Sequence, residues 1–130
     1  MAVRVYQNGQ TLNTTTGTSL ISSVSPHTLM TWLNFLTWPF AVRTSMVGLY
    51  GPTTPITAVQ IGQSLSNVGD IHVWTWGGNS LISTAGLFTF TTNTWYHVSY
   101  TFDGTSHRLY INGNLINTTT TPQIVGIYNQ

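Results

Sequence analysis

Residues 93–113 read NTWYHVSYTFDGTSHRLYING, and this stretch decides the fold. From Tyr96 to Phe102, aromatic and aliphatic side chains occupy every second position, with polar side chains between them. Neighbouring side chains of a strand point to opposite faces, so one face of this strand is expected in the core and the other in water. The Asp-Gly pair at 103–104 predicts a turn, and the Asn-Gly pair at 112–113 predicts a tight hairpin. The stretch therefore predicts three consecutive antiparallel strands.

The rest of the chain has the same strand-like character. β-branched and aromatic residues recur in runs of about five to nine, separated by Gly, Pro, Asn and Asp. No stretch combines helical spacing of apolar residues with a cap and a glycine stop. Strands are predicted at residues 3–7, 19–24, 28–36, 45–50, 58–62, 70–76, 81–84, 87–90, 95–102, 107–112 and 114–118. The whole chain, residues 1–130, is predicted to be a single all-β domain, an antiparallel β-sandwich.

Charged residues are rare in this chain. The 130 residues include three arginines (Arg4, Arg43 and Arg108), two aspartates (Asp70 and Asp103), no lysine and no glutamate, for a net charge of +1. Nucleic-acid binding needs clustered basic side chains that neutralise phosphates, so no nucleic-acid partner is expected. Recognition must instead rest on shape, stacking and neutral hydrogen bonds. Nearly neutral surfaces also associate readily, which favours an oligomer or assembly on a larger surface.

Signals for export and membrane insertion are missing from the sequence. The first residues lack the apolar stretch of a secretory signal, and no apolar run approaches the roughly 18 residues of a membrane span. The chain has no cysteine, so neither disulfides nor thiolate metal sites can form. We therefore expect the protein to stay in the cell that makes it and to have no membrane partner.

A family resemblance rests on residues 93–104 and 108–113. Trp and His on one strand, Asp-Gly in the turn and an aliphatic-Tyr-Ile-Asn-Gly strand resemble the signature hairpins of laminin G-like and pentraxin-like domains of the concanavalin A superfamily. Residues 28–34 resemble the early tryptophan-bearing strand of that family. The resemblance spans about residues 19–121 and implies an antiparallel jelly-roll sandwich in a short version. It also implies further closing strands, so residues 3–6 or a neighbouring subunit are expected to fill that edge of the sheet.

Catalysis has little support in the sequence, although glycosidases share the fold that the resemblance implies. Glycoside hydrolysis needs two carboxyl groups roughly 5 to 9 Å apart. Only Asp70 and Asp103 are present, and Asp103 is explained as the turn residue before Gly104. The sequence therefore predicts a non-enzymatic protein with no catalytic residues.

Metal and cofactor sites are also not expected. The four histidines follow no ligand spacing, and a half-buried His97 packed beside Trp95 is the better explanation of that residue. A calcium ion requires several oxygen ligands. Asp70 with nearby backbone carbonyls is the one candidate ligand group in the sequence. The superfamily's calcium site is thus undermined by the scarcity of acidic residues, and no cofactor is expected.

Aromatic residues form the first candidate binding surface. His72, Trp74 and Trp76 alternate along one predicted strand and therefore face the same way, and Asn79 follows them. If this face points outward, it is a platform on which sugar rings stack while amides and hydroxyls bind their hydroxyl groups. Alternatively, the two tryptophans fill the sandwich core or a subunit interface, which we favour.

A second aromatic pair, Trp38 and Phe40, stands in a predicted loop. It has the same two explanations as the first group. As exposed side chains, Trp38 and Phe40 would suit a sugar or serve as an anchor for another protein, because buried aromatic anchors dominate the energy of many interfaces. As inward-facing side chains they would belong to the core.

Two functions from different classes remain. The favoured one is a structural assembly protein, most concretely a decoration or cement protein that caps a viral (phage) capsid lattice as a homo-oligomer, for example a trimer. This assignment is an analogy at the level of the fold. It places the protein on the virion surface if it is viral and in the cytoplasm otherwise. The alternative is a carbohydrate-binding module of the lectin type.

Overall fold

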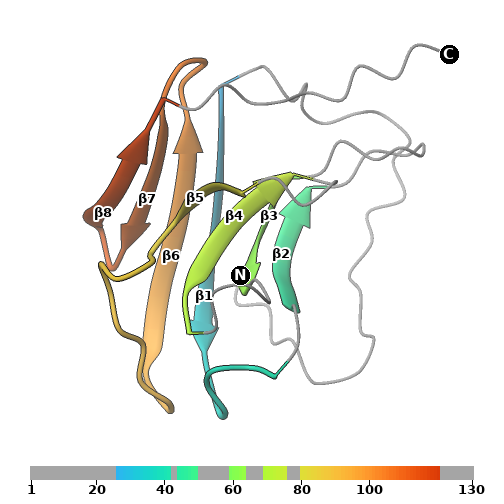
Figure 1. The fold of residues 1–130 in the computed structure, drawn as a ribbon, viewed down its shortest axis with the longest axis vertical. Coiled ribbons are helices and arrows are strands. Elements are labelled where there is room, and N and C mark those ends of the chain that lie inside the picture. Colours follow the sequence, from blue (N-terminus) through green and yellow to red (C-terminus); the bar gives the residue numbers. More distant parts are fainter. Residues whose placement is uncertain (1–25, 42–43, 50–58, 64–68, 76–79, 121–130) are drawn as a thin grey trace, which may run out of the picture.

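Two antiparallel four-stranded sheets face each other in the protein (Figure 1). The computed structural model describes residues 26–41, 44–49, 59–63, 69–75 and 80–120. Its strands are β1 (His27–Asn34), β2 (Thr44–Leu49), β3 (Val59–Gln63), β4 (Ile71–Thr75), β5 (Ser80–Ser83), β6 (Trp95–Phe102), β7 (His107–Ile111) and β8 (Asn114–Thr119). The first sheet has the order β1-β6-β7-β8 and the second β2-β3-β4-β5. The predicted all-β jelly-roll sandwich is thereby confirmed.

The β6-β7-β8 meander forms where the sequence predicts it. Along β6, buried and half-buried side chains alternate from Tyr96 to Phe102. Gly104 adopts a φ of 99°, which glycine tolerates at no steric cost, and this closes the β6–β7 turn. Asn112 and Gly113 adopt φ values of 52° and 80°, the pair of positive φ angles that a type I′ hairpin turn requires. Local sequence thus determines three of the four strands of the first sheet.

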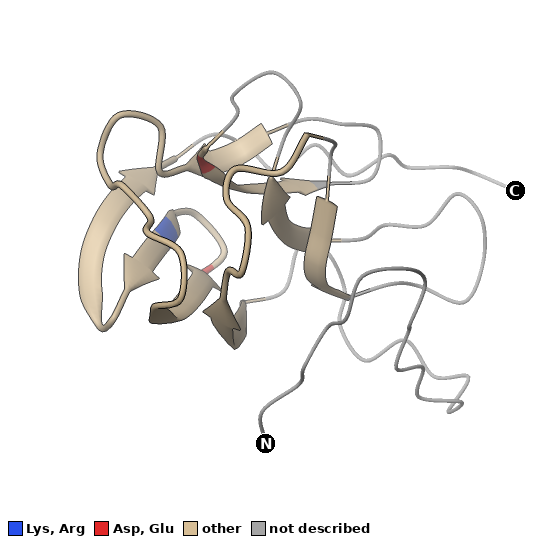
Figure 2. Ribbon diagram, turned by 90° about the horizontal axis from the view of Figure 1, so that it is seen from below, with Lys and Arg blue, Asp and Glu red and all other residues tan. Residues whose placement is uncertain are grey.

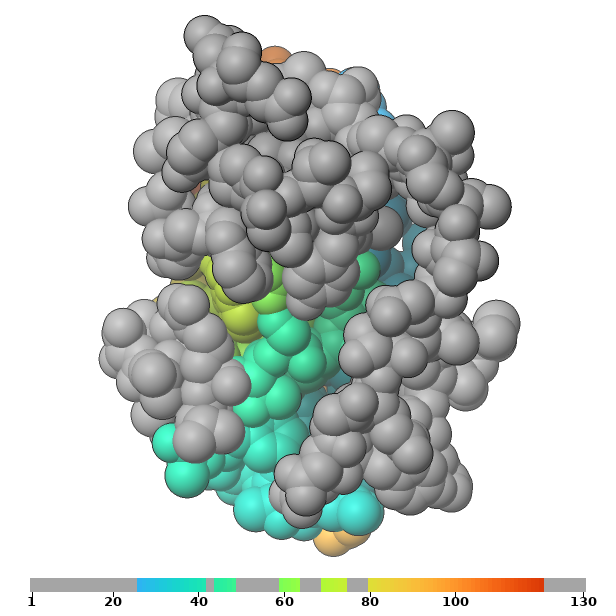
Figure 3. All heavy atoms as spheres, turned by 90° about the vertical axis from the view of Figure 1, so that its right-hand side faces the viewer, coloured from blue at the N-terminus to red at the C-terminus, as the bar shows by residue number. Residues whose placement is uncertain are grey.

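β1 completes the first sheet by pairing with β6 along its full length, with Leu29 opposite Tyr100. The core lies between the sheets and is built from aliphatic and aromatic side chains of both. The second sheet contributes Ile61 of β3 and the residues Ile71 and Val73 of β4, all fully buried. β2 forms one edge of the second sheet and lies at the surface in the view of Figure 3 (teal). Across the described ranges, no helix is long and apolar enough to cross a membrane.

The strand predicted at residues 87–90 is wrong. The amide of Leu87 donates to the carbonyl of Thr84 at 2.8 Å, so this segment continues a turn that follows β5. Gly86 sits inside that turn with a φ of 67°. Strand-forming composition is overridden here by the turn, and Phe88 and Phe90 still pack on the core. The strands predicted at 3–7 and 19–24, and the edge expected at 3–6, lie outside the described residues.

One polar pair is buried in the core. The hydroxyl of Tyr100 and Nδ1 of His107 form a hydrogen bond of 2.7 Å, and neither residue is exposed to solvent. The ring of Phe102 stacks on the His107 ring, with a centroid distance of 4.6 Å. This hydrogen bond joins β6 to β7 inside the sandwich, in addition to their backbone ladder.

Tyr100→Phe is expected to lower the free energy of unfolding by about 1–3 kcal/mol, since the buried Nδ1 of His107 loses its hydroxyl partner.

Burial also raises the pKa of Tyr100 above its usual 10.0. The unfolded chain then releases this proton first, so stability is complete below pH 10 and falls as the pH rises above it. Urea unfolding of the unchanged protein and of Tyr100→Phe, at neutral and at alkaline pH, measures the free energy of unfolding. If Tyr100→Phe loses as much stability at high pH as the unchanged protein does, Tyr100 is not the group responsible.

Candidate functional site

The side of the first sheet that points away from the second sheet, here called the outer face, carries large exposed side chains. Strand alternation places on it Thr28, Met30, Trp32 and Asn34 of β1, Trp95, His97, Ser99 and Thr101 of β6, Arg108 and Tyr110 of β7, and Leu115 and Thr118 of β8. The exposed fractions are 57% for Met30, 50% for Trp32, 48% for Trp95 and 53% for Leu115. Exposed apolar side chains gathered on one face are typical of interaction surfaces, which makes the outer face the candidate site.

Strand register arranges these side chains in rows across the sheet. Met30 lies opposite Ser99, Ser99 opposite Tyr110, and Tyr110 opposite Leu115. Side chains that lie opposite each other in a sheet are in contact range. The row therefore runs across all four strands, with an apolar residue at each end, a small residue and an aromatic ring in the middle.

A neighbouring row centres on an aromatic pair. Trp32 lies opposite His97, and their rings are 5.1 Å apart with an interplanar angle of 52°. Asn112 holds the backbone of His97 through two hydrogen bonds. The Oδ1 of Asn112 accepts from the backbone amide of His97 at 2.8 Å, and the backbone amide of Asn112 donates to the His97 carbonyl at 2.8 Å. His97 is half-buried as expected, and the ring that contacts it is Trp32 rather than Trp95. The backbone of His97 is thus held by the β7–β8 turn.

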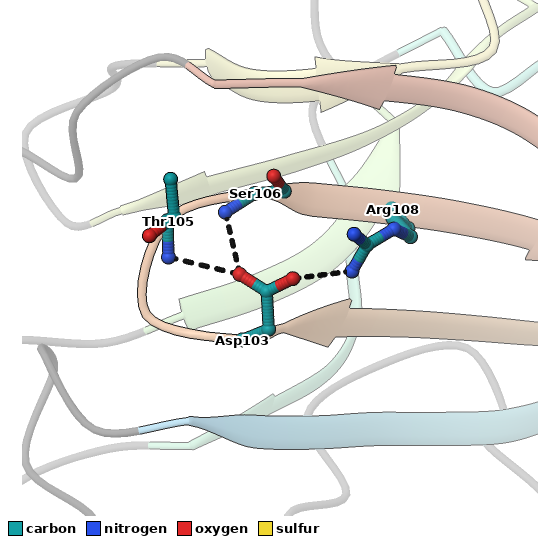
Figure 4. A network of polar contacts seen from close by, with 4 residues as sticks. All are labelled: Asp103, Thr105, Ser106 and Arg108. Atoms are coloured by element: carbon teal, nitrogen blue, oxygen red, sulfur yellow. Dashed lines mark hydrogen bonds and ion pairs between the residues drawn. The ribbon is translucent and has the colours of Figure 1, made fainter.

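Figure 2 shows how few Lys, Arg, Asp and Glu positions the described ribbon carries. Arg108 and Asp103 form an ion pair at one end of the outer face. Arg108 donates from Nη1 to Oδ2 of Asp103 at 2.6 Å, while Oδ1 accepts the backbone amides of Ser106 and Thr105 (Figure 4). These hydrogen bonds, from Ser106 first and then from Arg108 and Thr105, lower the pKa of Asp103 to about 2. The carboxylate thus caps the β6–β7 turn, as the sequence predicts, and is a poor proton acceptor at neutral pH.

Comparison with known families identifies the chain. The matching family model is described as the concanavalin A-like lectin/glucanases superfamily, laminin G type, and it matches residues 8–130. The chain belongs to this superfamily. Comparison with curated proteins gave no match, and neither did comparison with solved structures. The resemblance found in the 93–113 hairpins is confirmed. Because lectins and glucanases share the superfamily, membership alone does not choose between binding and catalysis.

In this concanavalin A-like domain, His72 and Trp74 do not form an open platform. They share one face of β4 as predicted, and that face points away from the core residues Ile71 and Val73. Both are nevertheless buried, with exposed fractions of 3% and 4%. A Cβ at Gly62 would lie 2.7 Å from Cη2 of Trp74, so the indole ring lies over this glycine. Trp74 is therefore a packing residue outside the space between the two sheets.

Trp38 and Phe40 are packed on the core rather than presented to a partner. The ring of Trp38 lies 4.3 Å from that of Phe35 and 5.4 Å from that of Phe90. The side-chain amide of Gln63 holds the segment, since it donates to the Phe40 carbonyl at 2.6 Å and accepts the Phe40 amide at 2.8 Å. Of the two explanations of this pair, the inward-facing one agrees with these contacts.

Of the remaining predicted site residues, only Asp70 is described, and it is not part of the outer face. Trp76 and Asn79 lie outside the described residues. Asp70 directly precedes β4 and is half-buried. Among the described residues, no group of three or more His, Cys, Asp or Glu side chains could hold a metal ion. The calcium nucleus at Asp70 stays a prediction.

Trp32 and Trp95 are the site residues that sequence reasoning missed. Both signals were present in the sequence. Trp95 is two positions before His97 and thus in phase with the polar face of β6, and Trp32 is in phase with Thr28 rather than with the buried Leu29. Strand alternation, applied to every tryptophan, would have placed both on the outer face.

Proposed function

We propose that this chain is a non-catalytic structural protein that associates with copies of itself and with a protein lattice, as a decoration protein on a virus capsid does. The observation that carries the proposal is the outer face, on which Met30, Trp32, Trp95 and Leu115 are about half exposed on the strands of the first sheet. Apolar and aromatic side chains of this kind supply most of the binding energy of protein interfaces. The virion surface as its location rests on the use of jelly rolls in viral shells, an analogy of fold.

The absence of catalysis is part of the proposal. Hydrolysis of a glycosidic bond needs one carboxyl group that donates a proton and a second that attacks or activates water. The hydrogen bonds that lower the pKa of Asp103 suit it to holding a turn. Asp70 is then the only other carboxylate side chain of the sequence. With only these two carboxylate side chains, a binding function is favoured over a catalytic one.

A carbohydrate-binding module is the second candidate, and one observation favours it. Trp32 and Trp95 are exposed on the same face, among the hydroxyl and amide side chains of Asn34, Ser99 and Thr101. The charged side chain of this face, Arg108, is paired with Asp103. Sugar rings stack their apolar sides on tryptophan, and neutral polar groups bind the hydroxyls. A glycan of neutral sugars is the ligand that this chemistry fits.

Sedimentation velocity and a glycan array on the same purified protein test the two candidates. Under the proposal, the protein sediments as an oligomer and retains no sugar. A monomer at every concentration that retains a glycan would overturn the assembly function and support the lectin. In that case Trp32→Ala should abolish retention without changing the denaturation midpoint, because the side chain is half exposed. Release of reducing sugar from a polysaccharide, lost in Asp70→Asn, would overturn both.

A further inference from the structure

We infer that two copies of this chain pack outer face to outer face, about a two-fold axis that runs parallel to the strands between β6 and β7. The inference rests on the proposed function and names the surface through which the copies associate. A contact about a two-fold axis uses the same patch on both copies, so the patch must complement itself. The two rows that cross all four strands, from Met30 to Leu115 and from Thr28 to Thr118, meet this condition.

Strand order determines which residues meet. Rotation by half a turn about the proposed axis exchanges β6 with β7 and β1 with β8, while each row keeps its position along the strands. Sheets that face each other pack with their strands within about 30° of parallel, so the rows stay close to alignment. Each row therefore lies against its own reversed copy.

The central row matches itself in this arrangement. Met30 of one copy comes to lie against Leu115 of the other, and Ser99 comes to lie against Tyr110. The first contact buries two side chains that are each more than half exposed in the single chain. The second sets a small side chain against an aromatic ring, which lets the faces approach closely.

The polar row also matches itself. Thr28 lies opposite Thr101, Thr101 opposite Arg108, and Arg108 opposite Thr118. After rotation, Arg108 of one copy meets Thr101 of the other, and Thr28 meets Thr118. Each guanidinium keeps its own Asp103 at 2.6 Å, so no unpaired like charges are brought together.

The size of the face predicts a reversible dimer. The area of the face follows from four strands about 4.8 Å apart and about seven residues per strand rising about 3.3 Å each, which gives roughly 450 Å² per copy. Two such faces bury roughly 900 Å² together, which is the range of weak or transient interfaces. Pairwise matching of rows also favours a dimer as the unit of assembly over the trimer considered from sequence.

The experiment introduces opposite charges at Met30 and Leu115 and follows dimerisation by sedimentation velocity at several protein concentrations. Met30→Lys and Leu115→Asp are each expected to weaken dimerisation at least about tenfold, because each places a charge against an apolar side chain. The double variant carries both changes and should recover most of the affinity, because each lysine then meets an aspartate of the other copy. Leu87→Lys is the matched control, since Leu87 is 55% exposed in the turn after β5 and is not on a strand of the first sheet.

The outcomes separate this inference from the proposed function. Association that survives Met30→Lys and Leu115→Asp would overturn the inference and leave the assembly function standing on another surface. Loss in both single variants without recovery in the double variant would overturn the two-fold arrangement. A monomer at every concentration overturns the inference together with self-association, and retention of a glycan that needs Trp32 would assign the face to sugar. Unchanged denaturation midpoints establish that each variant is folded.

Discussion

Gly62→Ala is expected to lower the free energy of unfolding by about 3 kcal/mol, the upper part of the usual cost of overpacking. A Cβ at this position would overlap the backbone carbonyl of Thr44 and lie 2.7 Å from Cη2 of Trp74. Side chains can rotate away from an added methyl group, but a carbonyl of the neighbouring strand cannot. Because Thr44 pairs with Gln63 in the β2–β3 ladder, relief of the clash must disturb that pairing. Urea unfolding followed by tryptophan fluorescence measures the loss.

Gly113→Ala provides the comparison for this prediction. A Cβ at Gly113 would meet no atom within 4 Å, but the φ of 80° is unfavourable for alanine. This variant should lose about 1–2 kcal/mol from backbone strain alone. A smaller loss in Gly62→Ala than in Gly113→Ala would show that β2 does not approach β3 as closely as the structure has it.

Trp74→Ala is expected to destabilise the protein by about 3–5 kcal/mol, as for other buried tryptophans. Its indole ring is 4% exposed and covers Gly62, so truncation leaves a large cavity beside β3. Trp32→Ala is the contrasting variant and should cost about 1 kcal/mol or less, because half of that ring is in solvent. The denaturation midpoints of the two variants decide which tryptophan packs and which is available to a partner. Equal losses would contradict the assignment of the outer face.

Local pattern predicted the strands of both sheets to within one or two residues at each end. The β6-β7-β8 meander depends on strand alternation and on the turn residues Gly104, Asn112 and Gly113, all of which are visible in the sequence. β1 was predicted at residues 28–36 and lies at His27–Asn34. The failure at 87–90 has a local cause, the turn around Gly86, which strand propensity does not reveal.

The candidate site was predicted less well, for a reason of tertiary structure. Alternation correctly placed His72 and Trp74 on one face, but whether a face is covered depends on what packs against it. The same limit applies to Trp38, whose loop position in the sequence suited exposure and core packing equally. Trp32 and Trp95 could have been found, because their phase on β1 and β6 is readable without tertiary information.

The pairing of β1 with β6 has a consequence for how the chain folds. Strands β2 to β5 lie between these two neighbours in sequence, whereas β6, β7 and β8 are joined by short turns. Contacts that are close in sequence form early, and contacts that close a long loop form late. During synthesis β1 is therefore complete well before its partner strand exists. Until β6 emerges, the backbone of β1, with Met30 and Trp32 beside it, is open to pairing with other chains.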